Sequence, residues 1–328
     1  EAVIELCHLD VAIQSRISAA VDALAADGLR VLAVAEGRFE GHDWPPAEHD
    51  FDFTFVGLLG LSDPLRQKVP GAIAECRAAG IRVVMITGDY PATARAIAHQ
   101  AGLADGAEEL LSGDEMAMLS DEALRKRMAS VSICARIAPE QKLRIVQALK
   151  ANGEIVAMTG DGVNDVPALR AAHVGIAMGG RGTDVSREAA SLVLLDDDFG
   201  SIVQSVRLGR RIYDNIRKAM AFIFAVHGPI AGLALLPLLF GLPLLFGPIH
   251  IALLEMVIDP VCALVFEAEQ DEDDIMQRPP RDPGEPLFSL SLIVWSVFQG
   301  GLALHRRDRA EVQRRRPELE ARVRFRSR

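Results

Sequence analysis

The stretch from Glu154 to Leu169, Glu-Ile-Val-Ala-Met-Thr-Gly-Asp-Gly-Val-Asn-Asp-Val-Pro-Ala-Leu, constrains the fold of the chain more than any other. Its apolar start predicts a short buried strand that breaks at the glycines around Asp161. A helix is expected to start near Asp165, because Pro167 suits a first turn where a missing N–H costs little. Strand, tight turn and helix start place two carboxylates and an amide at the carboxyl edge of a parallel sheet.

A second stretch repeats this design. The apolar run Ile81–Ile86 predicts a buried strand, and it leads into Thr87-Gly88-Asp89 and a helix with Pro91 in its first turn. Two such turns could face one phosphate. Acidic residues and glycines beside a helix start suit a Mg²⁺ ion that itself binds phosphate. The alternative for either turn alone is an acidic loop that caps an ordinary helix.

Further strands and helices alternate along the chain. Strands are expected at 29–35, 51–61, 131–136, 173–178 and 190–195, and helices end near Gly28, Ala79, Gln100 and Lys150. This alternation predicts a doubly wound parallel α/β sheet. Lys142 stands in the first turn of the helix that begins at Pro139, against the helix dipole, where either a nearby phosphate or simple solvation accounts for it.

The residue composition of the chain changes after Asp198. A helix rich in Arg and Lys runs into Ala219–Phe240, and a short loop joins it to Leu244–Ala268; both runs are apolar and long enough to span a bilayer. Half of all residues are hydrophobic, which is high for a soluble enzyme, and the net charge of −10 argues against a nucleic-acid partner. The basic residues ahead of the first span put that end, and the α/β part, in the cytoplasm.

Ionisable residues within the two spans predict a cation site. Glu255 and Asp259 are four residues apart and share a helix face, while Pro260 and Pro229 each free a backbone carbonyl. Charges in a membrane are costly, so an ion site is the expected explanation. His227 is a further candidate ligand.

The end of the chain allows two interpretations. Leu287–Leu304 is a third apolar run, barely long enough to span, and from Arg306 onward ten Arg stand against four acids. An outward crossing would leave this basic tail outside, against the usual charge bias. The tail is therefore either not the natural continuation, as after a truncation or frame shift, or a juxtamembrane segment that meets anionic lipid. The chain opens without Met, as if cut from a longer protein, and its four separated cysteines are expected to be free thiols.

Taken together, four motifs in this order resemble the P-type cation-transporting ATPases, closest to the calcium-pump branch. They are Asp63-Pro-Leu-Arg66, Thr87-Gly-Asp89, Pro-Glu-Gln-Lys142 and Thr159-Gly-Asp-Gly-Val-Asn-Asp165. The resemblance covers residues 1 to about 300. It implies an integral, multi-pass protein of the plasma (cell) membrane that transports a metal cation, Ca²⁺ or similar, with ATP and Mg²⁺ as cofactors.

The resemblance also implies a division of the chain. Residues 1–50 would end the nucleotide-binding domain, and 51–200 would be a phosphorylation domain of haloacid-dehalogenase-like, Rossmann-like fold. Residues 201–218 would be a stalk helix that couples phosphorylation to the ion site, and 219–304 would be transmembrane helices. Residues 305–328 would be the Arg-rich tail, either native or non-native. The spans would be the fifth and sixth of the pump.

Residue roles follow from the same resemblance. Thr87 and Gly88 would contact the phosphoryl group, with Asp89 supporting their loop and Lys142 neutralising charge. Mg²⁺ would be bound at Asp161 and Asp165, and Asn164 would complete the phosphate environment. The remaining implied contacts are ATP at Arg30, Asp63 and Arg66, and the transported cation at His227, Glu255 and Asp259. His227 stands where calcium pumps carry an amide, which puts Ca²⁺ selectivity in question.

Important parts of the pattern are absent from the sequence. The nucleophile motif Asp-Lys-Thr-Gly-Thr does not occur, nor do the Thr-Gly-Glu actuator loop and the first four spans. The chain is expected to be a partial pump that cannot form an acyl-phosphate without the missing N-terminal portion as partner.

Two other functions are open at this stage. A stand-alone phosphatase of the same superfamily could use Asp50 and Asp52 as its nucleophile motif, although that motif requires a strand before its first aspartate. A non-catalytic pump fragment would share every motif and show no turnover even when given its missing half.

Overall fold

The computed structural model describes residues 2–39, 51–103, 109–241 and 247–302. The chain forms two compact units, Glu1–Gln204 and Ser205–Arg328. The Arg-rich tail and Asp50 lie outside the described residues, so the expectations for them are not addressed by the structure.

The first unit opens with two helices and a hairpin. Helices α1 (Ala2–Leu6) and α2 (Val11–Ala26) precede strands β1 (Arg30–Arg38) and β2 (Asp52–Leu61), which pair antiparallel along their length. Asp10 caps α2 by accepting a hydrogen bond from the Ile13 N–H at 2.8 Å. Because β1 and β2 pair, the predicted domain boundary at residue 50 falls within the hairpin connection; the division itself stays a prediction.

The remaining strands of this unit are all parallel and form two sheets. The first has the order β3-β5-β4 (Met85–Ile86, Val131–Ala135, Glu109–Ser112), and the second β6-β7-β8 (Ala157–Gly160, Val174–Met178, Leu192–Leu194). The α/β class with parallel strands is confirmed. A single continuous sheet was expected, however, and among the described residues β3 and β6 each pair on one side only.

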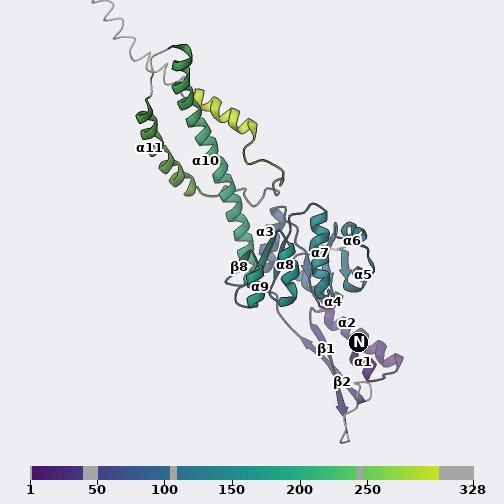
Figure 1. The fold of residues 1–328 in the computed structure, drawn as a ribbon. Helices are drawn as coiled ribbons and strands as arrows, with labels where there is room; N and C mark the ends of the chain where they lie inside the picture. The colour runs from purple at the N-terminus through teal and green to yellow at the C-terminus, as the bar shows by residue number, and fades with distance from the viewer. Residues whose placement is uncertain (1, 40–50, 104–108, 242–246, 303–328) are drawn as a thin grey trace, which may run out of the picture. The chain divides into compact units, whose positions relative to one another are not determined.

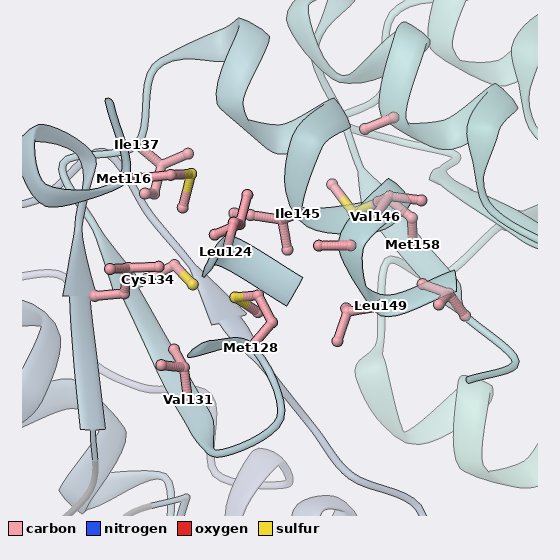
Figure 2. Packing of buried hydrophobic residues seen from close by; sticks show 14 of the residues in the cluster. Met116, Leu124, Met128, Val131, Cys134, Ile137, Ile145, Val146, Leu149 and Met158 are labelled. Carbon is pink, nitrogen blue, oxygen red and sulfur yellow. The ribbon is translucent and has the colours of Figure 1, made fainter. Parts of the chain in front are cut away.

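Helices cover both faces of the β3-β5-β4 sheet. Helices α3 (Val69–Ala78) and α4 (Pro91–Gln100) pack on one face, where Ile133 and Ala135 join their cluster. The other face carries a larger cluster, to which β5 contributes Cys134 (Figure 2). Strand β5 is buried on both faces, which explains why its sequence is apolar without alternation.

The larger cluster links the two sheets. Val84 and Ile86, at β3, pack against the same core that holds Val156 and Met158, at β6. Its helices are α5 (Gly113–Met118), α6 (Asp121–Arg127), α7 (Pro139–Ala151) and α8 (Val166–Ala171). The strands that precede the two predicted phosphate turns therefore share one hydrophobic core.

Four elements of the structure were not predicted from the sequence: β4, α5, α6 and α9 (Asp184–Ala189). They are short, with at most seven residues each, so hydrophobic periodicity has little length over which to show itself. A usable signal was present in Ser112 and Glu115, which form a capping box at the start of α5.

Long apolar helices dominate the second unit. Helix α10 (Phe199–Phe240) begins in the first unit and continues unbroken through Pro229 and Pro237 (Figure 1), and α11 (Pro248–Glu267) follows. Both are long and apolar enough to cross a membrane, in agreement with the two predicted spans. A third helix, Leu290–Leu302, has a described length of about 20 Å at ~1.5 Å per residue.

Candidate functional site

The Thr87–Asp89 turn is held rigidly at the end of β3. The Thr87 hydroxyl donates to the Asp89 carboxylate at 2.8 Å and accepts from the Asp89 N–H at 3.1 Å. Backbone bonds tie this turn to the segment after β5, because Arg136 N donates to the Asp89 carbonyl and Ile137 N to the Thr87 carbonyl, each at 3.0 Å. Arg136 has a φ of +53°, a left-handed conformation held by these bonds.

The second predicted turn follows β6, where a 3₁₀ turn (Val163–Asp165) leads into α8. Asp165 is 6% exposed, and its carboxylate accepts from Lys142 Nζ at 2.6 Å and from the Gly162 N–H at 3.2 Å. Gly160 permits this arrangement, because a Cβ there would lie 2.5 Å from the Asp165 Cβ. The structure thus brings Lys142 and Asp165 together and explains a lysine in the first turn of α7.

Asp161 and Asn164 lie at the exposed side of this turn. The backbone of Asp161 is fixed, since its carbonyl accepts from Thr183 N at 2.9 Å and from Ser186 Oγ at 3.1 Å. Its carboxylate, in contrast, is directed to no partner within the described part of the chain. Of the two predicted Mg²⁺ ligands, Asp161 therefore has oxygens to offer, whereas Asp165 is engaged by Lys142 and Gly162.

The predicted nucleotide contacts lie at two places in the first unit. Arg30 is within 3.9 Å of the Asp89 carboxylate, which puts it beside the first phosphate turn. Arg66 donates to the Asp197 carbonyl, while Asp63 is exposed at the end of β2. The sequence spacing did not indicate the contact between Arg66 and Asp197, which are 131 residues apart.

The turn at Asp196–Asp198 forms the surroundings of Arg66, the second of these two places. Asp197, at a φ of +52°, accepts from the backbone N–H groups of Gly180 and Arg181. Lys68 donates to Asp198 at 2.9 Å, and this hydrogen bond lowers the pKa of the Asp198 carboxyl. The start of α10 is thereby connected to the segment that precedes α3.

The phosphatase motif finds no support in the fold. Asp52 is the first residue of β2, so the strand follows the aspartate pair instead of preceding it. A nucleophile carboxylate of this class emerges at a strand's carboxyl end, and the structure gives Asp52 the opposite position.

A second cluster lies between α10 and α11, within the second unit. One ligand atom each from His227, Glu255 and Asp259 lies within 4.8 Å of the others. His227 Nε2 is 2.9 Å from Glu255 Oε2, and Nδ1 is 2.9 Å from the Ile223 carbonyl. Because a carbonyl only accepts, Nδ1 carries a hydrogen, and Nε2 is the ring nitrogen that faces the carboxylates. The structure therefore brings together all three predicted cation ligands.

Proline at position 229 removes the helical hydrogen bond to the Ala225 carbonyl. That carbonyl lies against Gly300 of the helix Leu290–Leu302, where a Cβ would be only 1.9 Å from the oxygen. The glycine lets two backbones approach closely, as small residues do between membrane helices.

The basic part of α10 is paired with the acidic segment after α11. Arg207 lies 3.4 Å from Asp271, Lys218 lies 3.0 Å from Glu272, and Asp214 lies 2.7 Å from Arg278. The hydrogen bond to Glu272, with a smaller contribution from Glu269, raises the pKa of Lys218. Sequence reasoning identified the basic stalk and the acidic loop separately; their opposite charges were the signal that could have paired them.

Comparison with known proteins follows the same division. Residues 11–173 match a family model described as haloacid dehalogenase-like hydrolase, and residues 243–304 match one described as cation transporting ATPase, C-terminus. The first match contains both phosphate turns and Lys142. The second contains Glu255 and Asp259.

Individual relatives support the combination. The chain is 43% identical over 282 residues to a calcium-transporting ATPase of Bacillus subtilis, covering 86% of this chain and 32% of that protein. It is 38% identical over 292 residues to calcium-transporting ATPase 1 of Lactococcus lactis (88% and 33%), and 42% over 278 to cation-transporting ATPase pma1 of Synechocystis (83% and 30%). The chain thus spans about a third of the length of these relatives.

Proposed function

The chain belongs to the P-type cation-transporting ATPases, as the C-terminal portion of such a protein, and on this basis we propose that it serves ATP-driven transport of a metal cation through an aspartyl-phosphate. The first unit would hold the phosphate and the second the cation. The relatives, together with the apolar helices α10 and α11, support a place in a membrane. We assign it to the cell membrane, with the α/β unit in the cytoplasm.

The observation that carries this proposal is the position of the two phosphate turns. Thr87–Asp89 follows β3 and Asp161–Asp165 follows β6, and each of these strands lies at an edge of its own sheet among the described residues. A further parallel strand between them would join the sheets, and its carboxyl end would lie between the turns. The phosphorylated aspartate would come from such a strand, supplied by a segment outside this sequence, which contains no Asp-Lys pair.

The residues present suit phosphoryl transfer. Such reactions depend mainly on positioning and on charge stabilisation around the phosphoryl oxygens. Thr87 and Gly88 would donate to those oxygens, and Asp165 would position Lys142 beside them. Mg²⁺ would be held by Asp161, and when bound it would neutralise phosphate charge and orient the reacting groups.

The nucleotide would lie against the arginines of the same unit. Arg30 is near the first phosphate turn, and Arg66 lies beside the Asp197 turn at the start of α10. Guanidinium groups bind phosphate in a bidentate fashion, which suits ATP. Asp63 would bind the nucleotide beside Arg66. Because α10 also carries His227, a change at its start could reach the cation cluster through one helix.

A joined protein tests this function. The chain is fused to the upstream portion of the Bacillus subtilis relative, and Mg²⁺-dependent ATP hydrolysis is measured in proteoliposomes. We expect cation-stimulated hydrolysis that falls by about 100-fold or more in Asp161→Asn, the size of effect typical for loss of a charge-stabilising group. Asp184→Asn is the matched control, because Asp184 is exposed and pairs only locally with Arg187. Equal activity of the two variants would contradict the role of Asp161, and no hydrolysis would contradict the function.

A further inference from the structure

We infer that the cation carried at His227, Glu255 and Asp259 is a first-row transition-metal dication, of the class of Co²⁺ and Zn²⁺, and not Ca²⁺. The inference rests on the proposed transport function, because it names the cargo of that site. It starts from the chemistry of the side chains that the two helices present to each other.

The side chains of α10 and α11 offer few oxygen ligands to a metal ion. Between Ala219 and Phe240 the only polar side chain of α10 is His227, and α11 contains no Ser, Thr, Asn or Gln. Ca²⁺ takes six to eight oxygen ligands in proteins. The side chains of these helices offer it two carboxylates and one imidazole, beside the carbonyls that Pro229 and Pro260 free. Imidazole nitrogen is a ligand that Zn²⁺, Ni²⁺, Cu²⁺ and Fe²⁺ prefer.

The histidine is oriented as a metal ligand. Its Nδ1–H donates to the Ile223 carbonyl at 2.9 Å, which fixes the ring and directs Nε2 toward Glu255 and Asp259. Metal-binding histidines nearly always have their second ring N–H held by a carbonyl or carboxylate, which fixes the tautomer and raises the basicity of the ligand nitrogen.

The three candidate ligand atoms also lie close together. Nε2 and the Glu255 Oε2 are 2.9 Å apart. An Asp259 carboxylate oxygen lies within 4.8 Å of both, so one ion can contact all three side chains. Glu255 and Asp259 stand one helical turn apart on α11, so one ion can bind both.

Direct binding tests the inference without ATP. The purified chain, in lipid nanodiscs, is titrated with Co²⁺, whose visible absorption reports its ligands, and the bound Co²⁺ is then competed with Zn²⁺ or Ca²⁺. We expect Co²⁺ to bind at least about tenfold more tightly than Ca²⁺. His227→Asn should weaken Co²⁺ binding by about tenfold or more, the lower end of losses seen even for indirect metal contacts.

His250→Asn is the matched control. His250 lies at the start of the same helix pair but outside the cluster, and its Nδ1 accepts only the nearby Gly247 N–H. This variant should bind Co²⁺ like the unaltered chain. A second readout is pulsed electron paramagnetic resonance of Mn²⁺, which detects a coordinated ¹⁴N nucleus in the unaltered chain; it decides the matter even where His227→Asn does not fold.

Ca²⁺ binding as tight as Co²⁺ binding, a His227→Asn variant equal to His250→Asn, or Mn²⁺ bound without a nitrogen ligand would each overturn the inference and leave cation transport standing. Selective Co²⁺ binding by a chain whose joined form hydrolyses no ATP would have the reverse meaning. It would retain the metal site and remove the pump.

Discussion

Replacement of Lys142 by Met should substantially lower the free energy of unfolding of the α/β unit. The Lys142 and Asp165 side chains are 23% and 8% exposed, and their charged atoms are 2.6 Å apart. Removing one partner of a buried ion pair costs about 3–5 kcal/mol, because the remaining charge stays buried without compensation. The Gly162 N–H still stabilises Asp165 in the variant, so we expect a loss of about 2–3 kcal/mol.

The buried thiol of Cys134 provides the assay. It lies in the core that also holds Met158, and burial raises its pKa to about 12, so a thiol reagent should label it only when this unit opens. A loss of about 2–3 kcal/mol corresponds to labelling that is ~30–150-fold faster under native conditions. Peptide mass spectrometry separates Cys134 from the other three cysteines.

Two control variants test whether the effect comes from the buried charge. Lys126→Met removes an exposed pair with Glu122, at 3.1 Å, and should change the rate by no more than about twofold. The double variant with Asp165→Asn should label more slowly than Lys142→Met alone, because no charge is left buried. A rate for Lys142→Met equal to that for Lys126→Met would refute the reasoning.

Two further predictions concern other parts of the chain. Gly300→Ala should separate the helix Leu290–Leu302 from α10 and destabilise their packing by about 1–3 kcal/mol, because the new methyl would meet the Ala225 carbonyl. Cross-linking between engineered cysteines on the two helices should become less efficient in this variant. Gly301→Ala should leave the cross-linking unchanged, because a Cβ at Gly301 meets open space. The hydrogen bond from Lys68 lowers the pKa of Asp198 from its ordinary value of 3.8. The ionised Asp198 carboxylate therefore stabilises the folded chain above pH 3.8, and this contribution is lost as the pH falls through the lowered pKa of the folded state. The Gly200 amide, which donates to Asp198, should keep its hydrogen-exchange protection at pH 4 and lose it below; a loss already at pH 5 would contradict this.

Long periodic segments and motif turns were predictable from the sequence. The helix that begins at Pro91 and the two apolar helices are found where the pattern placed them, and the strand at Thr159 (Ala157–Gly160) lies two residues later than its apolar run predicted. Each depends on local signals: an apolar run, a proline at a helix start, or a span-length stretch without charge. The residue types of both candidate sites were also predictable, since carboxylates after buried strands or inside a membrane have few structural explanations.

Contacts between distant segments were not predictable in this way. Nothing in the spacing indicates that Lys142 reaches Asp165, or that His227 donates to its own helix while facing Glu255. Such pairings depend on helix packing and on sheet order. The division of the parallel strands into two sheets was missed for a related reason, because alternation of strands and helices predicts parallel pairing but not which strands are neighbours.

Phosphorylation with radiolabelled ATP tests the central claim most directly. The chain is incubated with ATP and Mg²⁺, alone and together with the upstream portion of the Bacillus subtilis relative, and the proteins are separated in acid. The account predicts an acid-stable, hydroxylamine-labile label on the upstream portion, only when both parts are present, and none on this chain alone. A hydroxylamine-labile label on this chain by itself, or no label from the two parts together, would contradict it.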